Sequence, residues 1–60
     1  MTFRELEKLV LADGWRRKSC VGSHNHYVHS LKPGKVTIPN HGGDIPNAVV
    51  QSVLKQAGLK

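Results

Sequence analysis

The stretch CVGSHNHYVHS at residues 20–30 holds three of the four histidines of the chain, His24, His26 and His29. Histidine titrates closest to neutral pH and is the commonest metal ligand, so this cluster could transfer protons or bind a metal. In a strand, His24 and His26 would point to one face of the sheet, and Tyr27 and His29 to the other. We expect Tyr27 to lie in the core and His29 to be a strand-edge residue.

A zinc site would need three or four of these side chains in a tetrahedral arrangement. His24 and His26, together with Cys20 or His41, would supply suitable atoms. The sequence has no Cys-x-x-Cys motif, no Cys/His pair at zinc-finger spacing and no acidic residue near the cluster. We therefore expect no metal and no other cofactor, which leaves proton transfer and a plain polar strand as interpretations.

The chain is strongly basic, with nine Lys and Arg against four Asp and Glu and a formal net charge of +5 on 60 residues. This balance favours a polyanionic partner, either nucleic acid or an acidic protein. A membrane partner is disfavoured because the chain has no strongly basic amphipathic helix and no apolar run near the roughly 20 residues that span a bilayer. Basic residues that could follow phosphates surround the expected strands: Arg16, Arg17, Lys18, Lys32 and Lys35.

The length predicts one domain, residues 1–60, of marginal stability, because a folded chain of this size hides only roughly 60% of its unfolded surface. Charged residues among the first ten disfavour a secretory signal. The single cysteine, Cys20, suits a reducing compartment. We expect a soluble, cytoplasmic protein.

Both ends of the chain have helical patterns. Thr2 and Glu5 have the spacing of a capping box, and the apolar residues that follow recur at helical spacing as far as Gly14. We therefore expect a helix over 3–12. Near the C-terminus, Pro46 suits the first position of a second helix. One apolar face of that helix consists of Val50, Val53, Leu54 and Ala57.

Three segments between the helices have strand character, at 15–20, 23–30 and 36–38. Pro33-Gly34 suits a turn before the third strand, and Pro39 ends that strand because it lacks a backbone donor. This order predicts an α+β fold, α-β-β-β-α, with a three-stranded antiparallel sheet and both helices on one face. The other face would be left in water as the working surface.

Several short motifs resemble HicA-type toxins of bacterial toxin–antitoxin modules. They are DGW at 13–15, GSH at 22–24, KPG at 32–34, VTIP at 36–39 and SVLKQAGL at 52–59. The resemblance covers nearly the whole chain. It implies a fold like the double-stranded-RNA-binding domain, cleavage of mRNA, and a HicB-type antitoxin as partner. Ser19 stands where many members carry an arginine.

In that family a glycine, often followed by serine, precedes the essential histidine, and this pattern falls on Gly22, Ser23 and His24. The resemblance therefore implies a metal-independent endoribonuclease with His24 as general acid/base. We expect Gly22 to let the RNA backbone approach closely. The other expected substrate contacts are Ser23, His26, Arg16, Lys18 and Lys35.

Two other interpretations fit the composition. One is a non-catalytic RNA-binding module of the same fold, since the basic surface serves both functions. The other is an interaction protein whose basic face contacts only an acidic protein.

Overall fold

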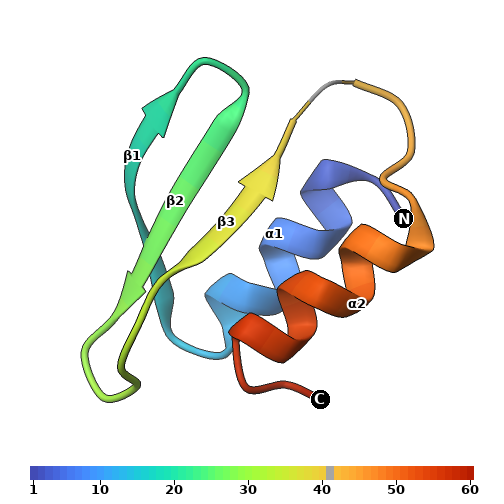
Figure 1. Ribbon diagram of the computed structural model, residues 1–60. Helices are drawn as coiled ribbons and strands as arrows, with labels where there is room; N and C mark the ends of the chain where they lie inside the picture. Colours follow the sequence, from blue (N-terminus) through green and yellow to red (C-terminus); the bar gives the residue numbers. More distant parts are fainter. Residues whose placement is uncertain (41) are drawn as a thin grey trace.

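The computed structural model describes residues 1–40 and 42–60, and its element order is the predicted one (Figure 1). Both helices lie on one side of a three-stranded antiparallel sheet of order β1-β2-β3. This confirms the α+β arrangement like that of the double-stranded-RNA-binding domain. The elements are α1 (Phe3–Ala12), β1 (Trp15–Val21), β2 (His24–His29), β3 (Val36–Pro39) and α2 (Asn47–Gln56).

Helix α1 has the predicted bounds because both of its end signals operate. The Thr2 hydroxyl accepts a hydrogen bond from the Glu5 N–H at 3.2 Å, and the Glu5 carboxylate accepts one from the Thr2 N–H at 2.8 Å. The backbone bond from Thr2 holds the pKa of Glu5 below its usual value. After the helix, Gly14 takes a φ of +101°, which glycine adopts without strain.

Helix α2 begins one residue later than predicted. Pro46 was expected at the first helical position, but its ψ of 144° is extended, so it is the residue that precedes the helix. Its carbonyl accepts from the N–H groups of Val49 and Val50, both at 3.0 Å. In the described ranges, no helix is long and apolar enough to cross a membrane.

The core lies between the helices and the sheet, and it contains Trp15 and Tyr27 as predicted. The Tyr27 hydroxyl donates to the Glu7 carboxylate at 2.5 Å, and burial raises the pKa of Tyr27. The remaining buried apolar residues come from α1, β3, the loop before α2, α2 and the residue after it: Leu6, Val10, Val36, Ile38, Ile45, Val50, Val53 and Ala57.

A group of polar contacts, here called the clasp, joins the ends of α1 and α2 to the sheet. It consists of Asp13, Trp15, His29, Lys32 and the Ala57 carbonyl. The Asp13 carboxylate accepts from the Trp15 indole N–H at 3.2 Å and from the Lys32 ammonium. The Ala57 carbonyl accepts from the same two groups, at 3.3 and 3.1 Å. The hydrogen bond from Lys32 holds the pKa of Asp13 below its usual value.

Both ring nitrogens of His29 are used within the clasp. Nε2 lies 2.7 Å from the Asp13 carbonyl, and Nδ1 accepts from the backbone N–H groups of Leu31 and Lys32 at 2.9 and 3.1 Å. The ring also meets Trp15 edge to face, with 5.2 Å between centroids. His29 is therefore a structural residue. Lys32, which we expected to follow phosphates, is likewise engaged in holding the fold together.

A β-bulge in β1 changes which of its side chains face the helices. Arg17 pairs with Tyr27, and Ser19 pairs with His26, so Lys18 is an extra residue between two regular stretches. In a regular strand, Trp15 and Val21 would share a face because they are six residues apart. The bulge shifts the alternation by one, so Trp15 points into the core and Val21 points away from it.

Candidate functional site on the outer face of the sheet

The sheet has one face without helices. Directly paired residues point to the same side of a sheet, and Tyr27 and Asn25 are buried on the helix side with their partners Val36 and Ile38. The alternate rows therefore point away from the helices. We call this surface the outer face, and it consists of Arg16, Ser19, Val21, His24, His26, Val28, Thr37 and Pro39.

The tight turn between β1 and β2 presents His24 at one end of the outer face. Val21 and His24 are paired, so Gly22 and Ser23 form a two-residue loop. Gly22 has a φ of +60° and Ser23 a negative one, as in a type II′ turn. A Cβ on Gly22 would meet no described atom within 4 Å, so the backbone conformation explains the glycine and crowding within the chain does not. His24 itself is exposed.

His26 shares the outer face with His24, as predicted. It is half-buried and lies two residues further along β2. The rise per residue of a strand puts it about 7 Å from His24. Its Nδ1 is 3.1 Å from the Thr37 hydroxyl on β3. Its partner on β1 is Ser19, so a polar row of Ser19, His26 and Thr37 crosses the three strands.

Two of the predicted basic residues, Arg16 and Lys35, lie toward the end of the sheet opposite His24. Arg16 pairs with Val28, which is four residues from His24, or about 13 Å. Lys35 is exposed directly before β3, at the same end of the sheet as Arg16. Lys18 is exposed at the bulge between the two ends. The structure thus brings Gly22, Ser23, His24 and His26 together, and it separates Arg16 and Lys35 from them.

The residues of the alternative zinc site do not share one face. Cys20 pairs with the buried Asn25, so it belongs to the helix side of the sheet. At this edge of the sheet Cys20 is exposed, and its thiol donates to the Gly22 carbonyl at 3.4 Å. No three His, Cys, Asp or Glu side chains of residues 1–40 and 42–60 could together hold a metal ion. His41 lies outside the described residues.

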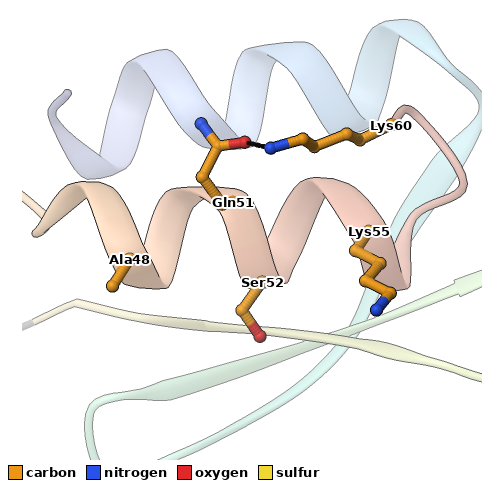
Figure 2. Close-up of a pocket in the computed structure, with 5 residues that line it drawn as sticks. All are labelled: Ala48, Gln51, Ser52, Lys55 and Lys60. Atoms are coloured by element: carbon orange, nitrogen blue, oxygen red, sulfur yellow. Dashed lines mark hydrogen bonds between the residues drawn. The ribbon is translucent and has the colours of Figure 1, made fainter.

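Two surface hollows lie off the outer face. One, of about 510 Å³, follows α2, where the side-chain amide oxygen Oε1 of Gln51 accepts from the Lys60 ammonium (Figure 2). The other, of about 400 Å³, lies between the start of α1 and the loop after β3, and it includes Arg4, Asn40 and Asp44. Neither is lined by an outer-face residue. His24 lines neither hollow and is exposed on a strand of the sheet, a surface that an extended polymer can cross.

Three outer-face residues near the histidines were not identified from the sequence. Thr37 contacts His26, while Val21 and Pro39 pair with His24 on its two sides. The position of Thr37 could have been predicted, because Val36 and Ile38 are apolar and face the core. The residue between them must then face the other side of the strand. For Val21 the signal is the Gly22-Ser23 pair, which suits a two-residue turn and places Val21 opposite His24.

The fold and the outer face define a small basic α+β domain with an exposed histidine on an open sheet surface. A comparison with models of known protein families matches residues 3–59 to the family described as the HicA toxin of bacterial toxin–antitoxin systems. The chain therefore belongs to the HicA toxin family. A comparison with curated proteins finds no match.

Proposed function

We propose that this chain is an endoribonuclease that cleaves mRNA, with His24 as its general acid/base. The observation that carries the proposal is the exposed position of His24 at the turn end of the outer face, in a basic chain of the HicA toxin family. A buried ring beneath the helices would have had no access to RNA.

RNA carries its own nucleophile, so a histidine can cleave it by proton transfer. The 2′-oxygen attacks phosphorus and loses its proton, the P–O5′ bond breaks, and the departing 5′-oxygen takes up a proton. An imidazole near neutral pH can accept the first proton or supply the second. Each such transfer accelerates the reaction by about 10²–10⁴-fold.

The neighbours of His24 bind the substrate in this proposal. Thr37 fixes the His26 ring through Nδ1, so the other ring nitrogen of His26 can contact the phosphate of the linkage that is cleaved. Gly22 and Ser23 border the same phosphate from the turn. Arg16, Lys18 and Lys35 contact phosphates further along the strand, where their charge attracts the RNA backbone.

We further propose a HicB-type antitoxin as the partner and the cytoplasm as the site of action, since mRNA is the substrate. An antitoxin that covers the outer face would block access to His24. An acidic surface suits that role, because the chain carries a formal charge of +5. The resting state would be the complex, with cleavage only after the antitoxin is lost.

The proposal is tested by incubating the purified chain with a defined RNA in the presence of a chelator. We expect cleavage that leaves 5′-hydroxyl ends, because the 5′-oxygen is the leaving group. A substrate with 2′-deoxyribose at the cleaved position should resist, because it lacks the nucleophile. Adding the antitoxin should stop the reaction.

Two results would contradict the mechanism. Cleavage of the 2′-deoxy substrate at an undiminished rate would exclude attack by the 2′-oxygen. RNA that is bound but left intact would favour the non-catalytic RNA-binding module, which the basic surface also fits.

A further inference from the structure

The two residues that pair with His24 on the neighbouring strands are both apolar. Val21 of β1 and Pro39 of β3 are its direct partners on the outer face. The row crosses three strands, or about 10 Å. Val21 is 66% exposed, against 36% for Val28, the apolar residue at the other end of the face. By contrast, the next row is polar throughout.

The proposed chemistry at His24 determines which part of the RNA lies over Val21 and Pro39. To act on a ribose oxygen, the imidazole must come within about 2.6–3.2 Å of it. The bases attached to the riboses on each side of the cleaved linkage then lie over side chains next to His24. Those side chains are Val21 and Pro39 across the sheet, and His26 along the strand. His26 suits the charged phosphate, and the apolar pair suits the faces of the bases.

We propose that Val21 and Pro39 form a nucleobase-binding surface on the two sides of His24. The inference rests on the proposed role of His24 and adds the part of the substrate that the chain binds besides phosphate. Aliphatic side chains contact the face of a base and do not read its hydrogen-bonding edge. This surface therefore adds affinity that is nearly independent of sequence.

The test is equilibrium binding of two oligomers of equal length and charge to the His24→Ala chain, which should leave the RNA intact. One is oligouridylate, and the other is a ribose–phosphate chain in which hydrogen replaces every base. In this background, Val21→Ser should weaken binding of oligouridylate roughly three- to tenfold, as expected for loss of one partly buried apolar side chain. It should leave binding of the base-free oligomer unchanged.

Val28→Ser is the matched control, because Val28 is apolar and on the same face but about 13 Å from His24. It should change neither affinity. Thermal unfolding of each variant checks that the fold is kept. The inference is overturned if Val21→Ser weakens both oligomers equally or neither of them, or if it weakens binding of the antitoxin alone.

Failure of this inference can be told apart from failure of the proposed function. The binding assay needs no cleavage, whereas the role of His24 is judged from cleavage by the parent chain. A parent that cleaves RNA while Val21→Ser binds oligouridylate normally would refute only the nucleobase surface. As a further expectation, the affinity lost in Val21→Ser should be similar for oligoadenylate and oligocytidylate.

Discussion

The two faces of β2 place histidines in opposite surroundings. On the helix side, both nitrogens of His29 are taken up by the backbone of Asp13, Leu31 and Lys32, and its ring packs against Trp15. The outer face has no helix on it (Figure 1), and His24 is exposed there. Residues of one type, five positions apart in one strand, thus serve either the fold or the proposed chemistry. Alternation along the strand decides which.

The same division applies to the basic residues. Lys32 belongs to the clasp, where Asp13 and the Ala57 carbonyl hold its ammonium group. Arg16, Lys18 and Lys35 are exposed. The net charge therefore overstates the number of basic side chains available to a polyanion, because the charge of Lys32 is paired within the fold.

The largest expected difference between the two regions is in stability. Trp15→Ala should lower the free energy of unfolding by about 3–5 kcal/mol, because it empties the core and removes two indole hydrogen bonds of the clasp. A domain this small should then be largely unfolded. Val21→Ala, on the outer face of the same strand, should change stability by no more than about 0.5 kcal/mol. Chemical denaturation measures both free energies of unfolding. Equal losses in the two variants would contradict the assignment of Trp15 to the core and Val21 to the outer face.

A smaller loss is expected from the structural histidine. His29→Ala leaves the Asp13 carbonyl and the Leu31 and Lys32 N–H groups without their partner, which should cost about 1–3 kcal/mol. His24→Ala should cost less than His29→Ala, because the His24 side chain is exposed. The same denaturation experiment compares them. The comparison fails if His24→Ala is the more destabilising variant.

The clasp should also make stability depend on acid. Lys32 lowers the pKa of Asp13 in the folded chain, so the carboxylate stabilises the fold above its unfolded pKa of about 3.9. This contribution is lost as the pH falls through the lowered value. The melting temperature of the parent should exceed that of Asp13→Asn at pH 7, and the gap should close below about pH 4. Glu5 at the α1 cap also has a lowered pKa, so it too makes stability depend on acid. Glu5→Gln measures that contribution separately.

The smallest expected effect is on the salt dependence of RNA affinity, which should distinguish the exposed basic residues from Lys32 of the clasp. For single-stranded RNA, the logarithm of affinity falls by roughly 0.7 per contacted phosphate for each log unit of salt. Arg16→Ser and Lys18→Ser should each reduce that slope by about this amount without loss of stability. Lys32→Ser should lower stability and leave the slope unchanged. A slope that falls only in Lys32→Ser would reverse the assignment.

Local signals explain how much of this could be predicted from the sequence. The capping box at Thr2 and Glu5 and the glycine after α1 gave the helix its bounds, and both operate in the structure. The alternation of His24, His26 and Tyr27 correctly divided β2 between its faces. The chemical role of His24 rests on the family and on its exposure, and it stays a prediction.

Other features depend on geometry that residue types do not reveal. The bulge falls at Lys18 between ordinary strand residues, with no glycine to mark it, so the change of face along β1 could not be predicted. The contacts of Lys32 in the clasp could not be predicted, because its partners, Asp13 and Ala57, are 19 and 25 residues away in sequence. Pro46 fits the residue before a helix as well as the first residue within it, since its φ of −56° suits both.

The central claim is that His24 serves chemistry while His29 serves the fold. It is tested most directly by the rate of RNA cleavage in His24→Ala and His29→Ala, each divided by the fraction of folded molecules. We expect His24→Ala to lose about 10²–10⁴-fold in rate and His29→Ala to stay close to the parent once unfolding is accounted for. Equal losses in the two variants, or full activity in His24→Ala, would contradict the account.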